Sequence, residues 1–430
     1  TREDHIVTNA AHDVAHAGHQ LGKGDRLVSA GDLEGSGLVL NVLGLLLIAF
    51  ISVFSSSMGQ SFFIGLFQVD ISESLGITAG QFGTAYAAVT LVSAGALMYF
   101  GPKVDWMSPR VFALAILTGL MLGIILLTST DLFWLGLLGL GLMRFNGQGM
   151  FGHLGNTLAG REFKIARGRA LSLVSLGYPS GEIALPLLVT LLLTLMTWQQ
   201  AWWLLGAFWC FIWLLLFLLA PWPESPIKLS KAERKQGPRP LRDRRFLLLL
   251  PLIMALPIIS TGLMIYQAHL TVDLGASVSA YALALTGLGV ARIFGALFVG
   301  PKIDRYGSVV TTRLFILPFA LALVLAPVIG GSAGLITLMT LSGLVVGFQE
   351  PVVNSLLVSI WGSQNLGRVR ATLQSAMVFG TAISPALLGC LIDYGVHFQV
   401  IIWGMLAYLC VAWVVAQVVL VKLGREQQVS

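Results

Sequence analysis

The sequence predicts an all-α membrane protein with twelve transmembrane helices in two pseudo-symmetric six-helix bundles. Three observations support this prediction: the composition, the placement of basic residues and an internal repeat. Hydrophobic residues make up 56% of the 430 residues and charged residues 11%, with a mean hydropathy of +0.84. Soluble domains usually carry about 25% charged residues, so this chain has too little charge for a surface that faces water.

Twelve apolar stretches of roughly the length that crosses a bilayer core as a helix occur along the chain. Their centres lie near residues 51, 89, 119, 145, 181 and 210 in the first half, and near 257, 289, 320, 347, 379 and 409 in the second. The alternating pattern of a membrane barrel is absent. Cys210, Cys390 and Cys410 all fall inside apolar stretches, which predicts buried small side chains and no disulfide or metal site.

The only long polar segment between spans covers residues 221–245. Its prolines and eight basic residues exclude it from the bilayer, so we interpret it as the boundary between two halves. The expected organisation is a tail at 1–36, a six-helix bundle at 37–220, the linker at 221–245, a second bundle at 246–422 and a tail at 423–430.

The basic residues outside the spans collect on one side of the predicted membrane. With twelve spans, they lie in the two tails, in the linker and in the loops after even-numbered spans. The opposite loops hold only acids among their charged residues: Asp70, Glu73, Asp131, Asp273 and Asp393. Basic loops stay cytoplasmic, so we expect both termini in the cytoplasm and a multi-pass protein of the bacterial inner membrane. The net charge of +6 is therefore a topology signal and does not indicate nucleic-acid binding.

Two sequence matches show that a whole half is repeated. GPKVD at 101–105 returns as GPKID at 300–304, and RGRALSLVSLGYPSGEIALPLL at 167–188 resembles RVRATLQSAMVFGTAISPALLG at 368–389. The offsets are 199 and 201 residues. Parallel repeats with a substrate site between them near the midplane are a known transporter architecture.

The repeated loop resembles the signature of the major facilitator superfamily, G-x-x-x-D-R/K-x-G-R-K/R, which follows span 2 and has a weaker copy after span 8. GPKVDWMSPR has Trp106 where a basic residue is usual, and GPKIDRYGS matches better. In addition, LMRFNGQG at 142–149 resembles the span-4 pattern R-x-x-x-G of the family. In the family the loop latches the cytoplasmic side of the outward-open state. The resemblance therefore implies these cytoplasmic gate residues: Gly101, Asp105, Arg110, Gly300, Asp304 and Arg305. The alternative is a loop that only sets topology through its charge.

Four ionisable residues lie near the middle of predicted spans: Arg144 in span 4, Glu182 in span 5, Arg292 in span 8 and Glu350 in span 10. Each costs about 2.5 to 3.5 kcal/mol at a helix centre on insertion scales, so they must be paired, hydrated or neutralised. In the fold that the resemblance implies, spans 3, 6, 9 and 12 are the outer helices. None of the four residues lies there, as a central aqueous cavity requires.

The two arginines predict an anionic substrate, because a guanidinium stays charged and can hold a carboxylate through two parallel hydrogen bonds. Arg292 lies about 12 Å inside the cytoplasmic helix end, a depth that resembles the substrate arginine of oxalate/formate and monocarboxylate porters. The alternative is a structural Arg–Glu pair. For Arg144, an ion pair with Glu182 or Glu350 is favoured over substrate contact. Further polar candidates on the inner spans are Gln60, Gln68, Asn146, Gln148, Tyr266, Gln267, Asn354 and Gln374.

Glu182 and Glu350 are candidate proton carriers, because a carboxyl whose arginine partner is taken by substrate can bind a proton in one state and release it in another. The segment SLGYPSGEIALP resembles the antiporter motif of drug exporters but lacks its Gly-Pro dipeptide. We therefore favour a bend that admits close helix packing.

The predicted function is a secondary active transporter that moves a small organic anion, such as a monocarboxylate, with protons by alternating access. The alternatives are a proton-driven exporter of drugs or metabolites and a non-transporting membrane receptor or sensor. No enzyme activity and no cofactor are expected, and no Walker loop for ATP is present. The expected partners are the cargo, protons and the lipid bilayer, with the monomer as the functional unit.

Overall fold

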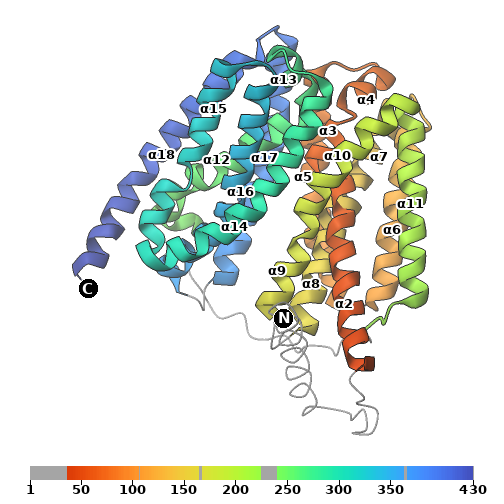
Figure 1. Cartoon of the computed structure of the whole chain (residues 1–430), viewed down its shortest axis with the longest axis horizontal. Helices are drawn as coiled ribbons and strands as arrows, with labels where there is room; N and C mark the ends of the chain where they lie inside the picture. The colour runs from red at the N-terminus through yellow and green to blue at the C-terminus, as the bar shows by residue number, and fades with distance from the viewer. Residues whose placement is uncertain (1–35, 106, 164–166, 224–239, 363–365, 430) are drawn as a thin grey trace, which may run out of the picture.

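The computed structural model describes residues 36–105, 107–163, 167–223, 240–362 and 366–429. Within these ranges every regular element is a helix and no strand occurs. Long helices lie side by side in one body, with α4 and α13 at one end of the bundle. The first described residues of α2 and the last of α18 lie toward the other end (Figure 1).

The first half runs from α2 to α11. Its elements are α2 (Ser36–Ser55), η1 (Ser56–Gly59), α3 (Ser61–Gly65), α4 (Gln68–Leu75), α5 (Ala79–Phe100), η2 (Gly101–Asp105), α6 (Pro109–Thr128), α7 (Phe133–Met143), η3 (Arg144–Phe151), α8 (Gly152–Glu162), α9 (Arg167–Ser175), α10 (Gly177–Leu195) and α11 (Trp198–Leu219).

The second half runs from η4 to α18. Its elements are η4 (Pro240–Arg242), α12 (Arg244–Ile265), α13 (Gln267–Asp273), α14 (Val278–Leu314), α15 (Leu317–Ile329), α16 (Gly331–Trp361), α17 (Leu366–Asp393) and α18 (Phe398–Val429).

Twelve crossings account for these helices. Ten helical segments of the described residues are long and apolar enough to cross a membrane. One of them, Ser279–Ile329, contains two crossings, because Gly307 interrupts α14 with φ 78° and ψ 165°. The fourth crossing, made of α7, η3 and α8, is not among these ten segments, because its centre is a polar π-helix. It is therefore counted in addition. The predicted twelve-helix fold is therefore confirmed.

The two halves repeat the same irregularity in their first spans. Span 1 is interrupted between α3 and α4 at Phe67, with φ −113° and ψ 8°, and span 7 between α12 and α13 at Tyr266, with φ −100° and ψ 34°. The two positions are 199 residues apart, the offset of the GPKVD repeat. Each is followed by a buried glutamine, Gln68 or Gln267. The pseudo-symmetry thus extends to a helix break that the sequence matches had not marked.

The halves meet through three helix pairs: α3 with α12, α5 with α17, and α10 with α14. Glycines allow this close approach. A Cβ on Gly65 would lie 1.9 Å from the carbonyl oxygen of Met264, and one on Gly83 would lie 2.1 Å from that of Pro385. The backbones of the two halves are therefore in direct contact.

Glycine also brings α10 against α2 within the first half. A Cβ on Gly177 would lie 2.8 Å from the backbone nitrogen of Phe54, and one on Gly181 would lie 2.0 Å from the hydroxyl oxygen of Ser57. The helix is interrupted at Leu176, between α9 and α10. The interpretation of SLGYPSGEIALP as a segment for close packing is consistent with this arrangement.

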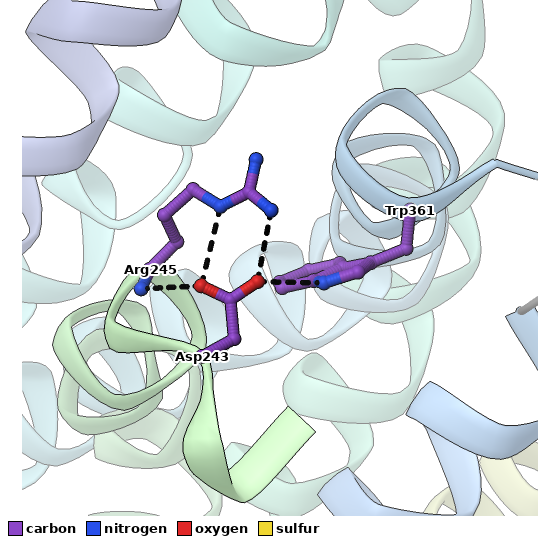
Figure 2. A network of polar contacts seen from close by, with 3 residues as sticks. All are labelled: Asp243, Arg245 and Trp361. Atoms are coloured by element: carbon purple, nitrogen blue, oxygen red, sulfur yellow. Dashed lines mark hydrogen bonds and ion pairs between the residues drawn. The ribbon is translucent and has the colours of Figure 1, made fainter. Parts of the chain in front are cut away.

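A polar network fastens the start of α12 to the end of α16 (Figure 2). Asp243 caps α12 by accepting from the backbone nitrogen of Arg245 at 2.9 Å; it also accepts from Arg245 Nη2 at 2.9 Å and from Trp361 Nε1 at 3.0 Å. Partial burial opposes ionisation of Asp243, but these hydrogen bonds and the charge of Arg245 together lower its pKa below the ordinary value. The first turn of the second half is thus anchored by a carboxylate that stays ionised.

The cysteines correct one prediction. All three are free, but Cys390 and Cys410 are exposed on α17 and α18, and Cys210 is half-buried. The prediction of burial was wrong because an apolar span also has a face that turns toward lipid, where a small apolar side chain is equally stable.

Candidate functional site

An ion pair between the two halves occupies the middle of the bundle. Arg292 Nη1 on α14 lies 2.6 Å from Glu182 Oε1 on α10. The side chain of Glu182 is 6% exposed and that of Arg292 27% exposed, so the arginine keeps contact with accessible space while the carboxylate is nearly enclosed. Glu182 Oε2 is buried and has no hydrogen-bond partner among the described residues. The pair is therefore singly hydrogen-bonded and leaves the guanidinium able to accept another anion.

Tyr178 completes this group, and the sequence analysis had not singled it out. The guanidinium carbon of Arg292 lies 5.6 Å from the centroid of the Tyr178 ring, and the Tyr178 hydroxyl accepts from Asn156 Nδ2 at 3.2 Å. Tyr178 and Glu182 are four residues apart on α10 and therefore share a face. The i, i+4 spacing from the midspan glutamate was the signal that could have identified Tyr178.

Arg144 occupies a different place in the first half. It is buried at the start of η3, donates from Nη1 to the carbonyl oxygen of Gly59 at 2.9 Å, and lies over the Tyr86 ring at 4.6 Å. The Tyr86 hydroxyl is 2.9 Å from the hydroxyl of Ser61. Spans 1, 2 and 4 thus build a cationic site around one guanidinium.

The ion pair expected for Arg144 is not formed. Glu182 pairs with Arg292, and Arg144 makes no ion pair with any carboxylate in the described part of the chain. Glu350 is an exposed residue of α16. The expectation was wrong because the guanidinium of Arg144 turns toward Gly59 and Tyr86 of its own half, whereas Glu182 faces α14 of the other half.

The remaining polar candidates of the first half lie around η3 and span 1. Asn146 is buried and donates to the carbonyl oxygen of Leu142 on its own helix at 2.9 Å; its side chain also closely approaches Gly119 of α6. Gln148 is exposed. Gln60 donates to the hydroxyl of Ser56 at 3.2 Å. In the described part of the chain, none of these three side chains forms a hydrogen bond with Arg292 or Glu182.

Tyr266 and Gln267 lie at the helix break of span 7, where the halves touch. The Tyr266 hydroxyl is 2.7 Å from the carbonyl oxygen of Ala79 and 2.9 Å from that of Pro385. Gln267 Nε2 donates to the carbonyl oxygen of Phe62 at 3.2 Å. Both side chains therefore join the halves at the end that carries α4 and α13.

Asp393 joins the halves at the same end, although the sequence analysis used it only for topology. Its Oδ2, at the end of α17, accepts from the hydroxyl of Thr78 at 2.6 Å and from the backbone nitrogen of Gly80 at 2.9 Å. Thr78 is the N-cap of α5. A carboxylate of one half thus meets the positive end of a helix dipole in the other.

The predicted gate residues lie at the opposite end of the bundle. Gly101 contributes its carbonyl oxygen to a contact of 3.1 Å with His153 Nε2, and Arg110 donates to the carbonyl oxygen of Phe217 at 2.6 Å. Arg305 lies over the Tyr306 ring at 5.2 Å, Asp304 is exposed, and a Cβ on Gly300 would meet nothing within 4 Å. The side chains of Asp105 and Gln374 lie outside the described residues.

The described polar contacts between the halves are therefore unevenly distributed along the bundle. Six hydrogen bonds that join the halves, one of them also an ion pair, lie near the midplane or at the α4/α13 end of the described part of the chain. The described gate residues contact only their own half. In the described part of the chain, the polar contacts between the halves thus gather at the midplane and at the α4/α13 end.

Comparison with known proteins agrees with this architecture. The family model "Major Facilitator Superfamily" matches residues 49–272 and 258–429. The chain belongs to the major facilitator superfamily, whose members are membrane transporters. Among curated protein sequences none matches this chain.

Solved structures support the fold. The chain is similar to a bacterial homologue of the human lysosomal transporter Spinster in an inward-facing and unoccupied conformation. The TM-score is 0.64 at 12% identity over 89% of this chain and 97% of that one. It is similar to the same homologue in an inward-facing and occupied conformation, with a TM-score of 0.64 at 12% identity over 88% and 97%. The protein is thus an integral, multi-pass transporter of this fold.

Proposed function

We propose that this transporter is secondary active and moves a small organic anion, such as a monocarboxylate, together with protons. The observation that carries the proposal is the Arg292–Glu182 ion pair, which joins the two halves at 2.6 Å near the middle of the bundle. A carboxylate of the cargo has the same chemistry as Glu182 and can replace it on Arg292.

Replacement couples the cargo to a proton. Removing one partner of a buried pair leaves an uncompensated charge, which costs about 3 to 5 kcal/mol. When the cargo carboxylate takes Arg292, Glu182 avoids that cost by binding a proton. When the cargo leaves, Arg292 returns and Glu182 releases the proton. Glu350, the second candidate proton carrier, is exposed on α16. Its charge acts on Tyr178, as the charge of Arg292 does, so it lies close to the same group of side chains.

The conformation supports alternating access. We infer from the basic residues that the termini are cytoplasmic, in a bacterial inner membrane, so the end opposite α4 and α13 faces the cytoplasm. Opening to the other side requires the Asp393, Tyr266 and Gln267 contacts to break. The gate residues Gly101, Asp105, Arg110, Gly300, Asp304 and Arg305 would then meet the opposite half.

The test is uptake of radiolabelled formate, acetate and lactate by proteoliposomes that contain the full chain, under an imposed pH gradient. We expect accumulation that a protonophore abolishes. Arg292→Ala removes the cargo site and should reduce uptake to that of empty liposomes, while Arg313→Ala, at the gate end of α14, serves as the matched arginine control.

Three other outcomes are decisive. Wild-type uptake by Arg292→Ala would overturn the central site. Extrusion of dyes or drugs without carboxylate uptake favours the exporter, in which the same pair would couple a proton to movement in the opposite direction. Binding without accumulation of any solute favours a receptor or sensor.

A further inference from the structure

The first half holds a buried positive charge that has no acidic partner among the residues the structure describes. Arg144 is 6% exposed, and its Nε is buried without a hydrogen-bond partner. Within the described part of the chain it makes no ion pair, and only Nη1 donates a hydrogen bond, to the Gly59 carbonyl oxygen. A guanidinium does not lose its proton in a protein, so the charge persists at every working pH.

The groups around Arg144 do not neutralise it. The Tyr86 ring, 4.6 Å from the guanidinium carbon, offers its π face, which compensates a cation only partly. A carbonyl oxygen satisfies one of the five N–H donors. Burial of a charge remains costly unless it is paired as well as hydrogen-bonded. A small anion would supply both the negative charge and the missing acceptors.

The hydroxyl of Tyr86 and its partner suit an anion as well. Tyr86 and Ser61 place their hydroxyl oxygens 2.9 Å apart. The two groups hold two hydrogens, and their mutual hydrogen bond uses one of them. The second hydrogen remains available to donate. No carboxylate among the described residues makes an ion pair with Arg144.

This site lies at a different depth in the bundle from the Arg292–Glu182 pair, measured along the helices from the α4/α13 end. Both α5 and α14 begin at that end of the bundle. Tyr86 follows Ala79 by seven residues, which places it about 10 Å into the bundle, whereas Arg292 follows Val278 by 14 residues, about 21 Å. Arg144 itself follows Phe133, where α7 begins at the same end, by 11 residues, about 16 Å, so it lies somewhat nearer that end than Arg292.

We propose that Arg144 binds a small anion, either a free halide or one carboxylate of the cargo, at a subsite of its own. The identity of the cargo rests on the proposed function, but the existence of the subsite does not. Because no carboxylate among the described residues competes for Arg144, the subsite binds its anion without a proton. Binding to Arg292 instead requires Glu182 to give up its partner.

The experiment measures anion-dependent melting of the purified full chain in detergent at pH 7.5, in buffer whose only other anion is the bulky isethionate. Chloride and formate are titrated separately, since a ligand that binds the folded state raises its melting temperature. We expect wild type to respond to at least one of them. Arg144→Gln should weaken the apparent affinity at least tenfold. Arg144→Lys, which keeps the charge but lacks the paired N–H donors of the guanidinium, should weaken it at least threefold.

The matched control is Arg313→Gln, since Arg313 also has a buried Nε without a hydrogen-bond partner but lies at the gate end of α14; it should respond as wild type does. A response to formate identifies a carboxylate subsite and a response to chloride alone a halide subsite. If Arg144→Gln fails to fold, the Lys variant decides. No anion response in wild type, or an unchanged response in the Arg144 variants, would overturn the proposal.

Uptake by the same preparations separates this inference from the proposed function. Anion binding at Arg144 without any carboxylate uptake refutes the transport proposal alone. Carboxylate uptake together with an unchanged anion response in Arg144→Gln refutes the subsite alone.

Discussion

Asp393→Asn should release the α4/α13 end of the bundle. The Asp393 carboxylate accepts from the Thr78 hydroxyl at 2.6 Å and from the Gly80 backbone nitrogen at 2.9 Å, both in the other half. Asparagine keeps one oxygen acceptor of nearly the same shape but loses the charge. The substitution therefore removes the charge-assisted part of two hydrogen bonds and the interaction with the N-terminus of α5, and leaves the packing in place.

The magnitude follows from the geometry. Hydrogen bonds to charged groups contribute about 1.5 to 3 kcal/mol, against about 0.5 to 1.5 for neutral ones. Asp393 is an exposed residue, so solvent screens part of its charge. We estimate a loss of about 1 to 2 kcal/mol, which shifts the equilibrium between the two end states about 5- to 30-fold toward opening at the α4/α13 end.

The assay is a distance distribution between spin labels on the two halves. Met98 on α5 and Leu297 on α14 are exposed near the gate end, and the three free cysteines can be replaced beforehand. In Asp393→Asn we expect a new population with a different label separation, because the gate end closes as the other end opens. The new population should be absent or minor in the parent protein.

Asp273→Asn is the matched control. Asp273 accepts from the backbone nitrogen of Phe398 at the start of α18, so it makes the same kind of contact within one half. It should leave the distance distribution unchanged. Equal distributions in Asp393→Asn and the parent, or an equal shift in Asp273→Asn, would refute the reasoning that Asp393 holds the halves together.

Three further predictions address the interface, the site and the anchor of the second half. Gly83→Ala should favour opening at the α4/α13 end, because its Cβ would lie 2.1 Å from the carbonyl oxygen of Pro385. Gly95→Ala on the same helix is the control: its Cβ would meet nothing within 4 Å, so the spin-label distances should not change. Tyr178→Leu should raise the KM for carboxylate uptake about 2- to 30-fold through loss of the cation–π contact of Arg292, and Tyr178→Phe should raise it much less; equal effects would refute the role of the ring. Asp243→Ala should lower stability by about 1 kcal/mol and Asp243→Asn, which still caps α12, by less. Because the pKa of Asp243 is lowered, its ionic contribution is complete above about pH 4 and is lost as the pH falls further, so the wild-type and Asn melting temperatures should converge in acid.

The sequence predicted the fold because bilayer insertion imposes strong local rules. Apolar length, the basic loops and the 199-residue repeat each constrain the topology independently, and the midspan Arg292 and Glu182 marked the site. An Arg–Glu pair was the alternative for Arg292, but the sequence did not say which glutamate would be its partner.

The pairing itself could not be predicted, because it depends on side-chain direction and on the conformational state. Arg144 lies at the start of a π-helix, where the extra residue per turn changes which neighbours its side chain meets. Tyr266 is itself the residue at a helix break, so a regular helical face gave no information about its contacts with Ala79 and Pro385. Tyr178 was missed because aromatic residues are common in apolar spans, so its four-residue spacing from Glu182 did not stand out.

The most direct measurement for the whole account is uptake of radiolabelled lactate by proteoliposomes that contain Glu182→Gln, with and without an imposed pH gradient. A neutral amide keeps the shape of the carboxyl but cannot exchange a proton. We predict that the variant still equilibrates lactate across the membrane while it no longer accumulates lactate in response to the gradient. Accumulation at the wild-type level by Glu182→Gln would contradict the claim that the pair between the halves couples the anion to the proton.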